Sequence, residues 1–477
     1  MFEKELCRYD AESLILCLYE FLAQSSHDYF IHTARFNLFD GLADDEKERI
    51  EQSSVENREE ARTSVRALRY TIEYVLSFGL SGDEIAQEEE LNTLVSLACE
   101  VVALADAADM LHFDSPKIGI EVAENSRVFL TEDDELREES KKLRVRQLSD
   151  SGHFLEAKDD EPYIAKAKDA FLQDTGINFE CFLDVLEALA FYVVDEEATA
   201  QKPNVFIGSK ESIISFLVGA FGDYYEPLEI SSCLDFLLLD ISHLRTVKGK
   251  NFDYLPFGRM KDRPNRLELR PIIPIKGKWV FSPVEMGVLR DRWVRGFAER
   301  FIPAKASFES TYQIMQQWKR HYEKSLEKET YSCFIENGMN PNFVFKNLSL
   351  HKKGNHPQYL GDFDVLAYNE EASTLWIVEC KEFEKVESSY DYMQLQVRWF
   401  GEKGKLKKFD RRIEYVNNHL SQIMQDLCLP YSEETQVNPI LVCNKLFLNV
   451  LNESSFNVIT LNELNALLAQ ERVNHRS

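Results

Sequence analysis

The sequence predicts an α+β protein of several domains, with a mostly helical N-terminal region followed by a C-terminal α/β core. First, the chain has 477 residues, and a single domain rarely exceeds about 250 residues. Second, apolar residues recur with helical spacing over most of the first 245 positions, whereas two segments after position 360 alternate as strands do. Third, the 44% of apolar and 29% of charged residues are typical of globular proteins.

Residues 1–245 are expected to form the helical region, a bundle whose surface docks or senses a partner. The segments with helical spacing cover residues 11–24, 56–78, 85–111, 165–194 and 209–245. Residues 114–164 differ in composition, because an acidic block is followed there by basic residues. They fit either an exposed charged helix or a connector that divides the region into two lobes.

Residues 246–304 are expected to form a β-containing bridging segment that leads by a helix to the last domain. Strands are expected over residues 266–275 and 279–283, and prolines place the first of them at the edge of a sheet. Basic residues in this segment fit either phosphate contacts or pairing with the acidic helical lobes. These residues are Arg259, Lys261, Arg263, Arg266 and Arg270.

The last domain, expected over residues 305–477, contains a candidate β-hairpin. Residues 361–368 and 375–381 are rich in β-formers and alternate in character, and only residues 369–373 between them resemble a turn. Such a pair of strands predicts an antiparallel hairpin.

The hairpin would bring three reactive side chains together. If the fold-back is centred between residues 371 and 372, Asp364 lies opposite Glu379, because the two positions are equidistant from that centre. Lys381 shares the face of Glu379, since side chains two apart point the same way. A slip of one residue would place the carboxylates on different faces.

Two facing carboxylates repel each other, and burying them unpaired is costly. A divalent cation such as Mg²⁺, which prefers hard oxygen ligands, removes that cost. Lys381 beside the metal would hold or deprotonate a water and stabilise charge on a phosphoryl oxygen. The pattern therefore suits phosphodiester hydrolysis, and its alternative is a surface hairpin with solvated charges.

Asp364 followed after a short gap by Glu379-Cys380-Lys381 resembles the PD-(D/E)XK nuclease superfamily, in its restriction-endonuclease-like, Mrr-type branch. The resemblance covers about the last third of the chain and implies an α-β-β-β-α-β core. It departs from the family name at one position, since Phe363 and not proline precedes Asp364.

The resemblance implies Mg²⁺-dependent cleavage of DNA, with Mn²⁺ as a substitute metal. Asp364, Glu379 and the main-chain carbonyl of Cys380 would bind the metal, and Lys381 would position the attacking water. Glu327, on a helix expected over residues 322–337, would complete the catalytic set, with Glu323 one turn earlier as the substitute candidate.

A net charge of -26 argues against a general nucleic-acid coat protein and for a local binding surface. The candidate nucleic-acid contacts lie near the hairpin, and a solvated basic surface is the alternative for them. They are Lys352, Lys353, Gln394, Lys405, Lys407, Lys408 and Arg411. The acidic helical region fits a basic protein partner.

The chain shows no signal-peptide pattern at its start and no run of about 18 apolar residues, so neither secretion nor a membrane span is expected. Its nine cysteines have no C-x-x-C spacing, which predicts buried free thiols in a reducing cytoplasm. The leading hypothesis is a Mg²⁺-dependent DNA endonuclease, in a bacterial restriction or anti-phage defence role that the resemblance implies. The alternatives are a catalytically idle nuclease-like fold that binds nucleic acid or a partner, and an RNA nuclease.

Overall fold

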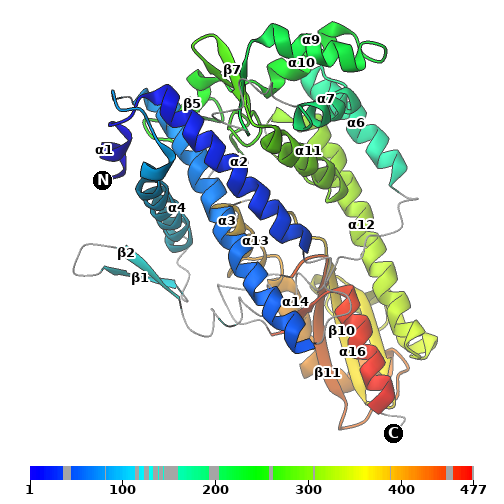
Figure 1. The fold of residues 1–477 in the computed structure, drawn as a ribbon. Helices are drawn as coiled ribbons and strands as arrows, with labels where there is room; N and C mark the ends of the chain where they lie inside the picture. Colours follow the sequence, from blue (N-terminus) through cyan, green and yellow to red (C-terminus); the bar gives the residue numbers. More distant parts are fainter. Residues whose placement is uncertain are drawn as a thin grey trace.

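The structure is a computed structural model, and it shows a helical N-terminal region joined to a C-terminal mixed sheet, as predicted (Figure 1). The longest helix of the C-terminal region, α12 (Glu309–Glu336), runs from the N-terminal helices to the sheet. The chain is described except at residues 36–43, 81, 113–117, 123–127, 133–137, 139–142, 144–159, 193–203, 257–261, 304–306, 387, 447–454 and 475–477.

The N-terminal helices form where the spacing predicted them. Two long helices, α2 (Ala11–Arg35) and α3 (Asp44–Phe78), lie side by side, and α4 (Asn92–His112) packs against α3 (Figure 1). In α2 the buried residues Leu14, Leu18 and Leu22 follow the i, i+4 spacing of an apolar stripe. The other helices of the region are α1 (Phe2–Leu6), α6 (Glu161–Thr175), α7 (Phe179–Ala190), α9 (Lys210–Phe221) and α10 (Pro227–Leu237).

Two expectations for this region are corrected. The helix expected over residues 165–194 is interrupted, because Gly176 ends α6 at φ 74° and the Asn178 side chain caps α7 by accepting from two backbone N–H groups. The described part of residues 114–164 includes an antiparallel pair of strands, β1 (Ile118–Val122) and β2 (Val128–Glu132), where a charged helix or a connector was expected. Most of the acidic block lies outside the described residues.

A small sheet in the order β3-β7-β6 joins the helical region to the bridging segment. Its strands are β3 (Phe206–Gly208) of the helical region, and β7 (Lys278–Phe281) and β6 (Ile273–Ile275) of the bridging segment. The proline-containing strand β6 lies at the edge, as predicted. The strand expected over residues 266–275 is shorter in the structure, because its first half forms a turn instead of extended backbone. Helix α11 (Pro283–Ala298) follows; the two remaining short strands are β4 (Thr246–Val247) and β5 (Lys250–Asn251).

Two of the basic residues singled out in the bridging segment, Arg263 and Arg266, pair with carboxylates inside the protein. The buried Arg263 donates to Glu73 of α3, and Arg266 pairs with Glu268 at 3.0 Å. Of the two alternatives for these residues, pairing with the helical lobes is therefore observed for Arg263 alone, whereas Arg266 pairs within its own segment. Arg270 stacks over the Phe236 ring, whereas Arg259 and Lys261 lie outside the described residues.

One hydrophobic core joins the helical region, the bridging segment and the first half of α12. Phe182 of α7, Trp293 of α11 and Trp318 of α12 all belong to it and are nearly inaccessible. The second half of α12 belongs to a different core, through Phe334. This helix therefore contributes to the cores of both regions.

The C-terminal sheet has five strands in the order β12-β11-β10-β9-β8. The first three strands in the chain pair antiparallel, and the last two are parallel to β10 and to each other. The strands are β8 (Val344–Ser349), β9 (Asp362–Asn369), β10 (Thr374–Lys381), β11 (Gln436–Cys443) and β12 (Asn457–Ile459). The helices that follow α12 are α13 (Ser389–Phe400), α14 (Lys407–Asn418), α15 (Leu420–Asp426) and α16 (Leu461–Asn474).

Helices cover both faces of this sheet. Trp376 and Val378 on one face pack in a core with Phe334 of α12 and Leu464 of α16. Leu366, Leu375 and Ile377 on the other face pack in a core with residues of α14 and α15. Because both faces are covered, polar side chains of the central strands reach solvent only near strand ends. Helices α14 and α15 were not expected.

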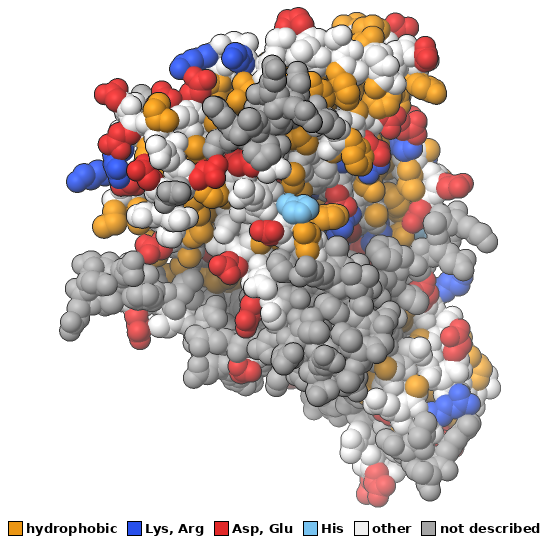
Figure 2. Space-filling view, viewed as in Figure 1, with side chains coloured by type: hydrophobic (Ala, Val, Ile, Leu, Met, Phe, Trp, Pro, Cys, Tyr) orange, Lys and Arg blue, Asp and Glu red, His pale blue; other side chains and the backbone are white. Residues whose placement is uncertain are grey.

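The helical region touches the sheet region directly at α13. The Ser389 hydroxyl, at the start of α13, donates to Asp106 of α4 at 2.7 Å. The Asp106 carboxylate in turn accepts two hydrogen bonds from the guanidinium group of Arg66 of α3, one at each oxygen. On the face shown in Figure 2, acidic side chains are spread over the helical region and do not gather in one patch. Among the described helices, none combines the length and apolarity that a membrane span requires.

The cysteines of this fold are free thiols, as predicted. Six of them are buried, including Cys380 in the centre of the sheet, whereas Cys7 and Cys428 are exposed and Cys99 is half-buried. No metal ligation by cysteine was expected from their spacing.

Candidate active site

The hairpin forms in the predicted register. Val365 pairs with Val378 and Leu366 with Ile377, so the fold-back is centred between residues 371 and 372. The paired residues end there, and Asp364 and Glu379 are the next residues on the two strands. The Asp364 carboxylate also accepts a hydrogen bond from the Cys380 backbone N–H at 2.8 Å, which fixes it against β10.

The ammonium group of Lys381 lies at the point where the oxygens of this site converge. Its Nζ is 3.0 Å from Glu379 Oε1 and 3.5 Å from Asp364 Oδ2. It donates to the Cys380 carbonyl at 2.7 Å and lies 3.3 Å from Oε1 of Glu323, which comes from α12. The structure therefore brings Asp364, Glu379 and Lys381 together as predicted.

The fourth predicted catalytic residue, Glu327, lies one turn beyond Glu323 on the same helix. Burial and the charge of Asp364 raise the pKa of Glu327, which places its carboxyl within the electrostatic reach of the site. The helix carboxylate that pairs with Lys381 is, however, Glu323. Glu323, the substitute candidate, thus makes the direct contact with Lys381, and the catalytic role of Glu327 stays a prediction.

The electrostatics of the site follow from crowding of like charges in a half-buried place. Burial and the nearby charge of Glu379 raise the pKa of Asp364. Burial opposes the charge of Lys381, but Glu379 and Asp364 outweigh it and raise the pKa of this amine overall. Lys381 is therefore a charged ammonium at neutral pH, able to donate hydrogen bonds and unable to accept a proton.

Arg412 of α14 is a site residue that the sequence prediction did not include in the catalytic set. It is buried, donates to the second oxygen of Glu379, and donates to the Leu360 carbonyl at 2.7 Å. Its guanidinium also stands 5.5 Å from the centroid of the Phe363 ring. Arg412 therefore holds Glu379 of β10 and the start of β9 in one arrangement.

A signal for Arg412 was present in the sequence. The buried residues Phe409, Ile413 and Val416 of α14 define an apolar helical stripe, and position 412 falls on that stripe. An arginine on an apolar stripe requires a buried partner. The signal was missed because the surrounding lysines indicated an exposed basic segment.

The donor atoms around Lys381 fit a hard divalent cation in their chemistry. The carboxylates of Asp364 and Glu379 and the carbonyl of Cys380 already surround one cationic centre, the ammonium. Within the described residues, no group of three or more His, Cys, Asp or Glu side chains is arranged to hold a metal. The ammonium of Lys381 occupies the point on which these oxygens converge, and the Mg²⁺ site stays a prediction.

Three of the seven predicted nucleic-acid contacts are exposed on elements that lie near the start of β9. Lys352 and Lys353 are exposed at the short helix η8 (Leu350–Lys352), which contacts η9 (Gln358–Leu360), and η9 contacts α14. Arg411 of α14 is exposed. The structure therefore brings these contacts next to the candidate active site.

The other predicted contacts differ in how accessible their charges are. The Lys405 ammonium stands 4.7 Å from the centroid of the Trp399 ring, and Lys407 pairs with Asp410 at 3.3 Å. The Lys408 side chain lies over Gly361, which has φ 69°. A Cβ atom added at Gly361 would lie 2.5 Å from Lys408 Nζ, so the two groups are in close contact. Gln394 is exposed, on the far side of α13 from the buried Gln396, and lines a cavity described below.

Comparisons of the chain with protein-family models, with curated proteins and with solved structures give no match. The functional conclusion therefore depends on the geometry of the site and on the sequence pattern alone.

Proposed function

We propose that this protein is a metal-dependent nuclease that hydrolyses phosphodiester bonds, with DNA as its expected substrate. The observation that carries the proposal is the convergence of Asp364, Glu379 and the Cys380 carbonyl on the single cationic position that Lys381 Nζ takes. Such a donor set is suited to Mg²⁺, which would be held by these three residues. When bound, the metal would supply Lewis-acid polarisation of the phosphoryl oxygen.

The roles of the protein groups follow from their contacts. Because a metal held by those donors would take the position of the ammonium, the Lys381 side chain would lie beside the metal. There we assign to its positive charge the stabilisation of negative charge on a phosphoryl oxygen and the orientation of the attacking water by hydrogen bonds. Arg412 fixes the orientation of Glu379 through its hydrogen bond and its own anchoring at Leu360. The exposed lysines near η8 and α14 would bind phosphates of the same strand, with release of counterions.

The rival function is a catalytically idle fold that only binds nucleic acid. One observation favours it: Lys381 already pairs with three carboxylates, those of Asp364, Glu379 and Glu323, so each of them has a cationic partner without a metal. Under this rival, binding to DNA would be independent of divalent cations.

A cleavage assay separates the two functions. Supercoiled plasmid, linear duplex DNA and a matched RNA oligonucleotide are incubated with the purified full chain in Mg²⁺, in Mn²⁺ and in EDTA. The proposal predicts nicked or linear DNA in either metal and intact DNA in EDTA. Intact DNA under all conditions, with retention of DNA on a gel, would support the idle fold, and cleavage confined to RNA would change the substrate class.

A further inference from the structure

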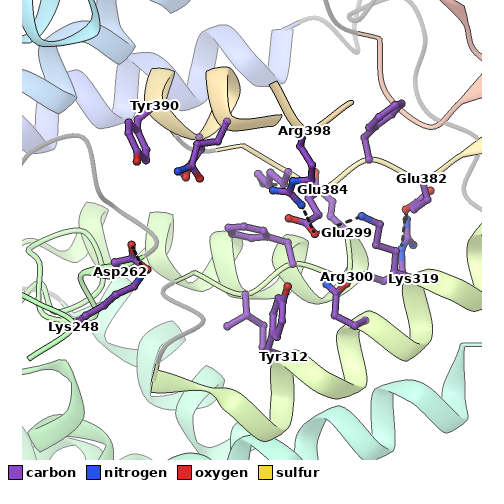
Figure 3. A pocket seen from close by; sticks show the side chains of 17 residues that line it. Lys248, Asp262, Glu299, Arg300, Tyr312, Lys319, Glu382, Glu384, Tyr390 and Arg398 are labelled. Atoms are coloured by element: carbon purple, nitrogen blue, oxygen red, sulfur yellow. Dashed lines mark hydrogen bonds and ion pairs between the residues drawn. The ribbon is translucent and has the colours of Figure 1, made fainter. Parts of the chain in front are cut away.

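A cavity of about 220 Å³ lies directly after the candidate catalytic strand, between α12 and α13 (Figure 3). Five cations line it, and each of them forms an ion pair with a carboxylate of the same lining. In Figure 3 the Lys248 side chain meets Asp262, and Arg398 meets Glu384. Because every cation of this lining is paired, a nucleic-acid strand would find its phosphate contacts on another surface.

Four cations on the surface that precedes β9 are not paired in this way. They are Lys352 and Lys353 at η8, and Lys408 and Arg411 of α14, and all four are exposed. In the part of the chain that the structure describes, none of the four forms an ion pair. The carboxylates of α14 do not neutralise them, since Asp410 pairs with Lys407 and the exposed Glu414 pairs with none of the four. The surface is therefore locally cationic, although the whole chain is acidic.

An exposed aromatic ring lies beside these cations. Tyr359 of η9 is 66% exposed, and η9 contacts both η8 and α14. The backbone that carries the ring is held in place, because Leu360 is buried and its carbonyl accepts a hydrogen bond from Arg412 at 2.7 Å. Lys408 Nζ lies over Gly361, two residues after the tyrosine. Tyr359 thus combines an exposed ring, an anchored backbone and cationic surroundings.

Two further rings lie near Tyr359 on α14. Tyr415 and the exposed His419 stack with their centroids 4.1 Å apart and their planes at 15°. Burial and, to a smaller extent, the neighbouring Tyr359 raise the pKa of Tyr415, because the two tyrosines lie close to each other. The cationic surface therefore carries flat aromatic faces, which are the groups on which the bases of a single strand stack.

This surface leads directly to the candidate active site. Gly361 precedes Asp364 by three residues of extended chain, a distance of about 10 Å at the rise of a β-strand. Arg412 joins the two places, since it donates to the Leu360 carbonyl and to the Glu379 carboxylate. A strand bound at Tyr359 would therefore bring a phosphate a few nucleotides away to Asp364 and Glu379.

We propose that the surface formed by η8, η9 and α14 binds single-stranded DNA, with a base stacked on Tyr359 and phosphates on Lys408 and Arg411. Stacking on this ring requires a base with a free face, and a base inside a duplex has none. The inference rests on the proposed nuclease function and adds its substrate class, a strand that is unpaired where it crosses Tyr359. A single-stranded branch and the open end of a duplex both meet this description.

The test measures binding by fluorescence anisotropy in EDTA, so that cleavage plays no part in it. The probes are a labelled oligothymidylate of about 15 nucleotides, within the site sizes of single-strand binding proteins, and a blunt duplex of the same length. The variants of the full chain are Y359A, Y359F and K408Q. Matched controls are Y224A, which removes a ring that is 80% exposed beside Asp223, and K278Q, which changes an exposed lysine of β7.

We expect the wild-type chain to bind the oligothymidylate about tenfold or more tightly than the duplex, as the gain of one stacked base predicts. Y359A should weaken binding of the oligothymidylate about 5- to 150-fold, the loss expected when a base loses its stacking partner. Y359F keeps the ring and should bind as the wild type and both controls do. K408Q should lower the slope of log K against log salt concentration by about 0.7, the value for one phosphate contact of a single strand, whereas Y359A should leave that slope unchanged.

Equal binding of the oligothymidylate by Y359A and the wild-type chain overturns the proposal, as does a duplex that binds as tightly as the oligothymidylate or an oligothymidylate that does not bind. These failures are separate from a failure of the nuclease function. A chain that binds single strands through Tyr359 but leaves DNA intact in Mg²⁺ contradicts the nuclease function alone. A chain that cuts DNA in Mg²⁺ while Y359A binds as the wild type contradicts the stacking site alone.

Discussion

The replacement of Lys381 by methionine tests the electrostatic description of the site. In the structure the ammonium lies within 3.5 Å of carboxylate oxygens from Glu379, Glu323 and Asp364. Removing one partner of a buried ion pair costs about 3–5 kcal/mol. Because the Lys381 side chain is 17% exposed to solvent, we expect a loss of unfolding free energy at the lower end of that range, about 3 kcal/mol.

Such a loss is large enough to measure by thermal unfolding in EDTA. A change of 1 kcal/mol shifts the midpoint by about 2–4 °C in a domain of 150–250 residues, so K381M should unfold about 6–12 °C below the wild-type chain. The matched control K324M changes an exposed lysine of α12 and should unfold with the wild-type chain.

The same variant predicts a change in the response to metal. In K381M the oxygens of Asp364, Glu379 and Cys380 no longer face an ammonium, so Mg²⁺ or Mn²⁺ should raise the unfolding midpoint more than it does in the wild-type chain. A K381M chain that is as stable as the wild type in EDTA, or that gains nothing extra from either metal, would refute the idea that the ammonium takes the place of a cation.

Replacing Arg412 by methionine should lower the free energy of unfolding by about 3 kcal/mol, because the Glu379 carboxylate and the Leu360 carbonyl lose a buried donor. Urea unfolding of R412M and of the control R411M, which changes an exposed neighbour, measures this loss. Equal unfolding midpoints for the two variants would contradict it. The raised pKa of Asp364 means that its charged form is disfavoured on folding, so stability is lost as pH rises through the folded pKa and regained below it. D364N should therefore be at least as stable as the wild type at pH 7. Its excess stability over the wild type should disappear as the pH falls toward the ordinary aspartate pKa. An excess stability that grows on acidification would contradict a raised pKa of Asp364. Glu327 has a raised pKa for the same reasons of burial and like charge, so E327Q should stabilise the chain at pH 7, and a destabilised E327Q would show that its charge is paired.

The sequence predicted the hairpin well because its determinants are local. Alternation of period two and a short turn define both strands, and the equal distances of Asp364 and Glu379 from that turn define the register. The strand expected over residues 279–283 was likewise found, with small differences at its ends. These elements carry strong periodicity over their whole length.

The parts that were not predicted depend on tertiary contacts. Helix α14 was hidden because lysines and arginines dominate its sequence, and its apolar stripe is short. The choice between Glu323 and Glu327 depends on how α12 is rotated against the sheet, which no local pattern determines. The first half of α12 was missed because it belongs to the core of the N-terminal helices, where Trp318 is buried.

Cleavage of an end-labelled DNA duplex in Mg²⁺ by matched variants tests the central claim most directly. The site variants are D364N, E379Q and K381M, and the controls are E371Q, in the exposed turn of the same hairpin, and K324M. We predict that the wild-type chain and both controls cut at equal rates, and that each site variant loses about 10²-fold or more. Full activity in any of the three site variants, prepared free of contaminating nuclease, would contradict the claim.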